Sequence, residues 1–309
     1  MADYSSECQI ARNDSDGSCA VSFHCFDTFN TVTVFDDSAA RADIESLLRE
    51  VHKDCLELHG LWSFSLDGSD VARINAAPAR CKVDFRSAML IAAMKAFHDV
   101  EPLFDFTVGP VSYLWKHAEC VPSDVEVATA LAHVGAEKVS VEGNAVVKAD
   151  PFVQVDVGGA AKGFAADAVA AHLRLAGIES ARIDLGGNLY MLGSHPSGRP
   201  WRVAVRVPEG SRVKSPVVEV RDKSVVTSGS YERFVEIEGG RYHHIIDATT
   251  GKPSASDIVS ATVVAASSLQ ADMLATTALL AGSSGIEGLR SRHPEAEIIA
   301  FTCDGTVLR

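Results

Sequence analysis

The chain has 309 residues, which is long enough for one large domain or for two lobes that share a core. Apolar residues make up 47% of the sequence and charged residues 22%, a balance typical of a globular protein rather than a disordered one. The formal net charge of −13 argues against nucleic acid as a partner, because an acidic surface repels a phosphate backbone.

The composition also bears on metals, redox state and location. An acidic protein would repel a diphosphate ligand unless a cation and backbone amides neutralised it, so such a ligand would predict a bound metal. Seven cysteines without C-x-x-C spacing favour reduced thiols over a zinc site or disulfides. Residues 1–17 lack the basic and apolar regions of a signal peptide, and no apolar run reaches spanning length. We therefore expect a cytoplasmic protein without a membrane span.

Residues 1–20 are predicted to form a disordered tail ahead of a single domain over 21–309. The domain opens with strand-like alternation over 21–35. Apolar residues at helical spacing then recur in three segments, 39–59, 84–98 (with Asp84 as N-cap) and 123–133. Residues 101–116 show no periodicity but many aromatic side chains, which favours a packed loop, and a hairpin is predicted over 139–147.

The second half of the chain alternates strands with two helices. A strand over 152–157 leads into a small-residue turn at 158–163 and a helix over 164–176. A second helix is predicted over 269–281. Further strands are predicted over 182–185, 201–207, 217–220, 224–227, 231–237, 242–246, 259–265 and 297–302. The sequence therefore predicts an α+β fold with mixed, largely antiparallel sheets and packed helices.

The turn at 158–163 is a candidate phosphate site. A glycine-rich turn before a helix presents free backbone N–H groups, and the helix dipole adds to their attraction for an anion. Lys162 adds a positive charge, and Asp156 could accept from a ribose or ring N–H. Close packing of a helix on a sheet demands the same small residues, so the segment alone leaves both interpretations open. A dinucleotide-binding motif is a weak match, because G-x-A-x-x-G lacks the second glycine.

Asp272 and Thr276 form a second candidate site. They lie four residues apart in the last predicted helix, and therefore on one face of it. A carboxylate and a hydroxyl are hard oxygen donors that suit Mg²⁺. A buried carboxylate needs a cation or hydrogen bonds, whereas a surface aspartate near a helix start would need neither. The pair alone leaves both possibilities open.

Three further segments each combine a functional interpretation with a structural one. In HHIID (243–247) a histidine could act as a general base, or the segment could be a strand end with an Asx-turn. The hydroxyl-rich turn at 227–231, with Ser228, could bind phosphate or ribose, or could interrupt a strand. The aromatic rings of FDF (104–106) could cradle a flavin or adenine, or could form a small hydrophobic cluster.

Taken in order, these segments resemble the ApbE family of FAD:protein FMN transferases. The resemblance covers nearly the whole chain from about residue 21 and rests on SDVARIN (69–75), LFDFTVGPVSYLW (103–115), DVGGAAKGFAADAVA (156–170), IDLGGNLYMLG (183–193), VVTSGSYERF (225–234), HHIIDATTGKP (243–253) and ADMLATTALLAG (271–282). It implies an ApbE-like, T-fold-related architecture with two lobes around a flavin cleft.

The resemblance also implies an activity and a site. Such enzymes use Mg²⁺ to cut FAD at its diphosphate, move FMN to a Thr or Ser hydroxyl of an acceptor protein, and release AMP. The Mg²⁺ would be held by the carbonyl of Gly159 with Asp272 and Thr276. The flavin- and FAD-binding positions fall on Leu103, Phe104, Asp105, Asp156, Lys162 and Ile246, and we add Ser228 to this set.

The general base and the reaction outcome stay open. His244 corresponds to the family's histidine for proton transfer, but the residues themselves allow His244 or Asp247 to accept the proton. The acceptor would be a flavin-dependent redox or reductase protein. If water replaced its hydroxyl, the enzyme would be an FAD pyrophosphatase that yields FMN and AMP. A non-catalytic flavin-binding protein or an NAD-type oxidoreductase would instead hold an uncleaved nucleotide.

Overall fold

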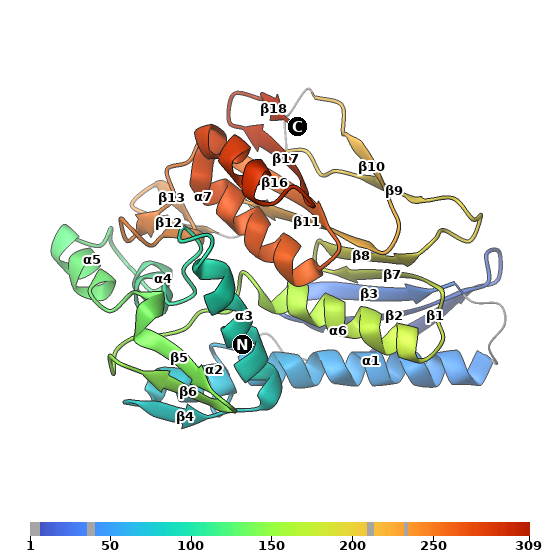
Figure 1. Cartoon of the computed structure of the whole chain (residues 1–309), viewed down its shortest axis with the longest axis horizontal. Coiled ribbons are helices and arrows are strands. Elements are labelled where there is room, and N and C mark those ends of the chain that lie inside the picture. The colour runs from blue at the N-terminus through green and yellow to red at the C-terminus, as the bar shows by residue number, and fades with distance from the viewer. Residues whose placement is uncertain (1–6, 36–40, 209–212, 232–233) are drawn as a thin grey trace.

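A nine-stranded sheet forms the centre of the computed structural model, which describes residues 7–35, 41–208, 213–231 and 234–309 (Figure 1). Neighbouring strands in it run antiparallel. In spatial order they are β1 (Gln9–Asn13), β2 (Ser18–Cys25), β3 (Thr28–Val34), β7 (Ser180–Leu185), β8 (Asn188–Gly193), β11 (Lys223–Gly229), β16 (Ile258–Ala265), β17 (Glu297–Thr302) and β18 (Val307–Leu308). The predicted α+β class with largely antiparallel sheets is confirmed.

Both faces of this sheet carry buried side chains, because successive residues of a strand point to opposite sides. One face is covered by three helices, α1 (Arg41–Trp62), α6 (Ala161–Leu175) and α7 (Ser268–Arg292, kinked at Gly282). These helices form the main core with sheet residues such as Val32, Ile183 and Val263. The other face packs partly against a hairpin of β9 (Trp201–Ala204) and β10 (Val217–Val220).

α1 illustrates how residue spacing selects the buried side of a helix. Its buried apolar residues recur every three or four positions, at Ile44, Leu48, Val51, Cys55 and Leu58. Charged residues such as Lys53 and Glu57 are exposed and lie 4.0 Å apart as an i,i+4 ion pair.

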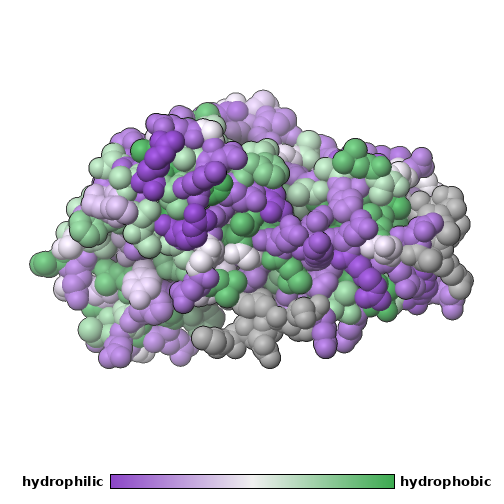
Figure 2. All heavy atoms as spheres, turned by 90° about the horizontal axis from the view of Figure 1, so that it is seen from below, coloured by the Kyte–Doolittle hydropathy of each residue, from purple (hydrophilic) through white to green (hydrophobic). Residues whose placement is uncertain are grey.

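Hydrophilic side chains cover most of the molecular face seen from below in Figure 2, and hydrophobic ones lie there in small groups.

A second group of elements lies beside the main sheet, mostly on the left of Figure 1. It comprises α2 (Asp70–Ala76), β4 (Arg80–Lys82), α3 (Phe85–His98), α4 (Gly109–Lys116), α5 (Asp124–Leu131), a 3-10 turn (Ala136–Lys138), β5 (Val139–Glu142), β6 (Ala145–Lys148), β12 (Phe234–Ile237), β13 (Gly240–His243), β14 (Ile246–Asp247) and β15 (Lys252–Pro253). The predicted N-cap of α3 is present, since Asp84 accepts from the N–H of Arg86. Trp115 of α4 donates to Gly251 O, between β14 and β15, at 2.9 Å, which joins the early and late segments of this group.

Two expectations for the N-terminal region were wrong. The predicted tail over 1–20 is ordered from Gln9, because β1 pairs with β2; residues 1–6 lie outside the described part. As an edge strand β1 buries little apolar surface, which explains its weak sequence signal. The strand-like alternation over 21–35 does not continue as one strand: β2 and β3 form a hairpin that turns at Phe26 and Asp27, with φ of 53° and 57°. Neither residue is the glycine or asparagine that usually marks such a turn.

Two expectations near the centre of the chain also failed. The segment 152–157 forms no strand, only an isolated bridge between Val108 and Gln154. The expected loop over 101–116 becomes helical from Gly109, with Pro110 in the first turn. These local patterns were misleading because apolar residues in a buried loop resemble those of a short buried strand.

Neither a membrane-spanning helix nor a disulfide occurs among the residues that the structure describes. Across the described ranges, no helix combines the length and hydropathy that crossing a bilayer requires. Each of the seven cysteines lacks a disulfide partner. A hydrogen bond with Cys55, together with burial, raises the pKa of Cys25 far above its ordinary value, so this thiol stays protonated and unreactive.

Candidate active site

The starts of α6 and α7 meet beside the glycine-rich bend at 158–160. Asp272 of α7 is only 2% exposed, and its Oδ2 accepts from the backbone N–H of Gly163 at 2.9 Å. That N–H lies in the first turn of α6, where backbone donors have no partner within the helix. The buried carboxylate thus has a hydrogen bond that offsets part of its desolvation.

Thr276 faces the same bend. A Cβ atom placed on Gly159 would lie 3.4 Å from Thr276 Oγ1 and 3.2 Å from Cε2 of Phe104. Thr276 Oγ1 also donates to Asp272 O at 3.2 Å. The structure therefore brings the predicted metal-binding residues Gly159, Asp272 and Thr276 together, with the ring of Phe104 beside them.

The donor set at this bend fits Mg²⁺. Within the described ranges, no three His, Cys, Asp or Glu side chains cluster as a metal site of their own. A carboxylate, a hydroxyl and a backbone carbonyl offer only oxygen atoms and are too few to fill an octahedron. Such a set suits an ion that keeps waters and binds substrate phosphates, and it does not suit tetrahedral zinc.

The glycines of this segment serve two different purposes. A Cβ on Gly163 would lie 2.5 Å from Ser268 O and 2.7 Å from Leu269 Cα, so α6 and α7 touch through their backbones there. Gly158 is exposed, and a Cβ on it would meet only Asp156 Oδ1, at 3.1 Å. Helix packing therefore explains Gly163, while the open bend at Gly158 leaves backbone accessible to a ligand.

Lys162 is a cation in an electrostatically unfavourable place. It lies in the first turn of α6, where the helix dipole favours anions and disfavours a positive side chain. It makes no hydrogen bond or ion pair with any residue that the structure describes. The residue that precedes α6, Ala160, has no side-chain cap to offer. An anion bound at the bend would supply the partner that the Lys162 side chain lacks.

The aspartates on either side of the bend shape its backbone. Asp156 Oδ1 accepts from Gly158 N at 2.8 Å, and Asp156 N donates to Phe106 O at 2.7 Å. Asp105 Oδ1 accepts from the backbone N–H and the hydroxyl of Thr107, at 2.7 and 2.5 Å. These bonds place the predicted flavin loop, with Leu103 37% exposed, alongside the bend.

A buried charge network holds that loop. Glu101 is 2% exposed and accepts from Arg292 at 2.7 and 2.8 Å and from His293 Nε2 at 2.8 Å. Phe104 N donates to Glu101 O at 3.0 Å, so the C-terminal end of α7 anchors the loop. Burial opposes ionisation of Glu101, but the hydrogen bonds and charges of Arg292 and His293 hold its pKa below the ordinary value.

This network predicts an acid-sensitive contribution to stability. Because the pKa of Glu101 is lower in the folded state than in the unfolded state, its contribution is fully present above the unfolded value of about 4.3 and is lost as the pH falls through the folded value. We expect Glu101→Gln to reduce the free energy of unfolding by about 3 kcal/mol at pH 7. Urea unfolding at pH 7 and at lower pH should show the gap to wild type closing in acid; a constant gap would contradict this role.

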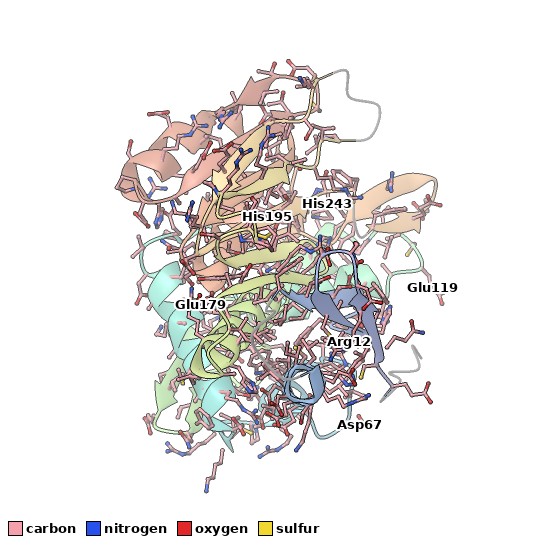
Figure 3. The ribbon with its side chains drawn as sticks, turned by 90° about the vertical axis from the view of Figure 1, so that its right-hand side faces the viewer. Arg12, Asp67, Glu119, Glu179, His195 and His243 are labelled. Atoms are coloured by element: carbon pink, nitrogen blue, oxygen red, sulfur yellow. The ribbon has the colours of Figure 1, made fainter. Side chains whose placement is uncertain are left out.

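The neighbouring histidines His243 and His244 have different surroundings. His243, labelled in Figure 3, donates from Nε2 to Ser254 O and accepts at Nδ1 from Ile245 N. Burial lowers the pKa of His243, and with both ring nitrogens engaged this way the ring is neutral. His244, the next residue, is exposed.

The remaining predicted residues have mixed surroundings. Asp247 Oδ1 accepts from the N–H and hydroxyl of Thr249, which is an Asx-turn. Ile246 is 5% exposed and belongs to a cluster with Trp115 and other residues of α4 and α5. Ser228 lies half-buried in β11 opposite Ala261 of β16. Asp247, Ile246 and Ser228 therefore lie on other elements than α6 and α7, which carry the residues around Asp272.

A model of the ApbE family matches residues 26–300 of the sequence. The chain belongs to the ApbE family. The FAD:protein FMN transferase of Vibrio cholerae serotype O1 is 33% identical over 274 residues, which cover 85% of this chain and 82% of that protein. The FAD:protein FMN transferase of Treponema pallidum is 34% identical over 263 residues, or 78% and 73% of the two chains.

Solved structures agree with this assignment. Flavin transferase ApbE from Vibrio cholerae superposes with a TM-score of 0.84 at 26% identity, over 98% of this chain and 97% of that one. The apo form of Pseudomonas stutzeri flavinyl transferase ApbE also gives 0.84, at 28% identity over 97% and 93%. The resemblance seen in the sequence, the ApbE-like fold and the prediction of a transferase enzyme are confirmed.

One feature close to the bend was not predicted from the sequence. A cavity of about 280 Å³ is lined by Phe64, Ala72, Asn75, Ala76, Tyr113 and Gln154. The Asn75 amide donates to Val155 O at 3.1 Å and accepts from Val155 N at 2.8 Å, so the cavity adjoins the segment that enters the bend. The rings of Phe64 and Tyr113 lie 6.2 Å apart. These segments are far apart in the sequence and come together only in the folded chain. The one signal in the sequence was Asn75, the last residue of the SDVARIN match.

Proposed function

We propose that this ApbE-family protein transfers FMN from FAD to a Thr or Ser hydroxyl of an acceptor protein, with Mg²⁺ bound and AMP released. One observation carries the proposal: a carboxylate, a hydroxyl and an open glycine bend converge, with an unpaired lysine on the adjoining helix start. This combination suits a metal-bound diphosphate. The curated relatives named FAD:protein FMN transferase support the choice of FAD.

The residues around the bend have distinct tasks in this proposal. Asp272 and Thr276, with the carbonyl of Gly159, would hold Mg²⁺, which when bound supplies charge neutralisation at the diphosphate. Lys162 and the backbone N–H groups of the bend attract the remaining negative charge. In phosphoryl transfer most of the catalysis comes from such positioning and electrostatics, so no covalent protein intermediate is required.

The reaction exchanges one phosphoester partner for another. The acceptor hydroxyl oxygen forms a bond to the FMN-side phosphorus, and the bond from that phosphorus to the bridging oxygen breaks. The bridging oxygen leaves with AMP, and the hydroxyl proton passes to a base. We assign this proton to His244, which is exposed, or to Asp247, whose Oδ1 already accepts two hydrogen bonds.

The flavin end of the substrate has two candidate contacts. Phe104, flanked by Leu103 and Asp105, adjoins the bend directly. The cavity beside Asn75 offers the rings of Phe64 and Tyr113 for stacking. Ser228 and Ile246 complete the predicted cofactor-binding set. The acceptor would be a flavin-dependent redox or reductase protein that presents its hydroxyl beside His244.

A direct assay tests this proposal. The purified protein is incubated with FAD, Mg²⁺ and a candidate acceptor, and the products are analysed by mass spectrometry and HPLC. We expect one FMN group on a Thr or Ser of the acceptor for each AMP released, and no product when a chelator removes the metal. Free FMN with unmodified acceptor would show a pyrophosphatase, and intact FAD under all conditions would rule out catalysis.

Replacing Lys162 should weaken FAD binding without reducing the stability of the fold. We expect Lys162→Gln to weaken FAD binding by about tenfold, because a charge-assisted contact to phosphate is lost. The free energy of unfolding without ligand should stay unchanged or rise by a few tenths of a kcal/mol, since a cation leaves a helix N-terminus. Equilibrium dialysis and urea unfolding measure the two effects. Unchanged FAD affinity would remove Lys162 from the site.

A further inference from the structure

The helices α6 and α7 cap each other. Asp167 of α6 accepts from three donors at the start of α7: Ser267 Oγ at 2.8 Å, Ser268 N at 2.7 Å and Leu269 N at 3.0 Å. In the opposite direction, Asp272 of α7 accepts from Gly163 N at the start of α6. Each helix start is therefore closed by a carboxylate of the other helix.

The two caps lie on either side of the backbone contact between the helices. Gly163 and Asp167 are one turn apart on α6, and Ser268 and Asp272 are one turn apart on α7. The contact itself allows no side chain, because a Cβ on Gly163 would lie 2.5 Å from Ser268 O. Sliding or rotating α7 against α6 would break the hydrogen bonds of both caps. The position of Asp272 relative to the bend thus depends on Asp167.

Capping alone does not account for Asp167. Ser267 already acts as the N-cap of α7, since its hydroxyl accepts from Gln270 N at 3.2 Å. Burial raises the pKa of Asp167, although the hydrogen bonds from Leu269, Ser268 and Ser267 oppose this. The charge of Asp167 is therefore costly where it lies, and α7 already has a cap without it. We infer that the Asp167 carboxylate serves to place α7 accurately.

We propose that Asp167 is a positioning residue for the Mg²⁺–diphosphate site: it fixes the start of α7 so that Asp272 and Thr276 face the glycine bend. This inference rests on the proposed function. The carboxylate of Asp167 is directed at the start of α7, so it acts through the backbone N–H groups of Ser268 and Leu269.

The test compares the Mg²⁺ requirement of wild type and Asp167→Asn. The variant keeps the side-chain volume but loses the charge and one acceptor. Two readouts are taken: the Mg²⁺ concentration that half-saturates FMN transfer, and the Mg²⁺ concentration that gives half of the rise in Tm with FAD present and acceptor absent. We expect both to rise by about tenfold, as for other residues that orient metal ligands. The KM for FAD at saturating Mg²⁺ should change by less than about twofold.

A matched control separates positioning from loss of stability. Ser123 caps α5, where its hydroxyl accepts from Glu126 N in a capping box. Ser123→Ala should reduce the free energy of unfolding by about 1 kcal/mol and leave the Mg²⁺ requirement unchanged. If Asp167→Asn lowered Tm but kept the wild-type Mg²⁺ requirement in both readouts, the positioning role would be overturned.

Two further outcomes are decisive. Should Asp167→Asn fail to fold, Ser267→Ala removes one of the three donors to Asp167, and we expect the Mg²⁺ requirement to rise by about threefold. An unchanged requirement in Ser267→Ala would overturn the inference. If wild type itself showed no response to Mg²⁺ in either readout, the proposed function would fail. If wild type responds to Mg²⁺ and Asp167→Asn has the same Mg²⁺ requirement as wild type, the positioning role is contradicted while the proposed function stands.

Discussion

Replacing Asp272 with alanine should reduce the rate of Mg²⁺-dependent FMN transfer by about 10³-fold or more. The change removes the single carboxylate that we assign to the metal. It also leaves the Gly163 N–H without its acceptor, which costs about 1–3 kcal/mol of stability. Transfer rates at saturating FAD and a series of Mg²⁺ concentrations, together with thermal unfolding, measure both effects.

Asp272→Asn is the matched control for this variant. An asparagine oxygen can still accept from Gly163 N, so the helix cap and the fold should survive, while the negative charge for the metal is lost. We expect Asp272→Asn to unfold within a few degrees of wild type and still to be nearly inactive. If either variant transferred FMN at the wild-type rate with wild-type Mg²⁺ dependence, Asp272 would not be a metal ligand.

Gly163→Ala should be the most destabilising alanine substitution among the glycines of segment 158–163. The added methyl group would meet Ser268 O at 2.5 Å and Leu269 Cα at 2.7 Å, and backbone atoms cannot rotate away as a side chain can. We expect a loss of about 3 kcal/mol in the free energy of unfolding. The starts of α6 and α7 would also be forced apart, which would move Asp272 away from the bend and reduce transfer.

Gly158→Ala is the companion change a few residues earlier. Gly158 is exposed, its φ is not in the left-handed region, and a methyl group there meets only Asp156 Oδ1. We expect its free energy of unfolding to remain within about 0.5 kcal/mol of wild type. Urea unfolding of the two variants side by side checks the contrast. Equal stability of both variants would contradict the close packing of α6 on α7.

The sequence predicted the elements whose signal is local. Helices α1 and α3 follow regular apolar spacing, and Asp84 marks the start of α3. The hairpin of β5 and β6 follows its Gly-Asn turn. Failures occurred where pairing with another segment, rather than a segment's own residue pattern, decides the structure. The edge strand β1 is the clearest case, because it is defined by its contact with β2 rather than by its own residues.

The site shows the same division. The i,i+4 spacing of Asp272 and Thr276 was sufficient to place both on one helix face, and the glycines of the bend marked the open backbone. No local pattern shows that Asp272 caps α6, or that Asp167 caps α7, because those bonds join residues about a hundred positions apart in the sequence. Likewise, the cavity near Asn75 is assembled from four separate segments. Tertiary packing alone creates such relations.

A crystal structure of the protein with FAD and Mg²⁺, without acceptor, tests the central claim most directly. We expect one octahedral cation about 2.1 Å from Asp272 Oδ1, Thr276 Oγ1 and the Gly159 carbonyl, with diphosphate oxygens completing its shell and Lys162 close to them. A nucleotide bound with its phosphates away from the 158–163 segment, or a cation that avoids Asp272, would contradict the account.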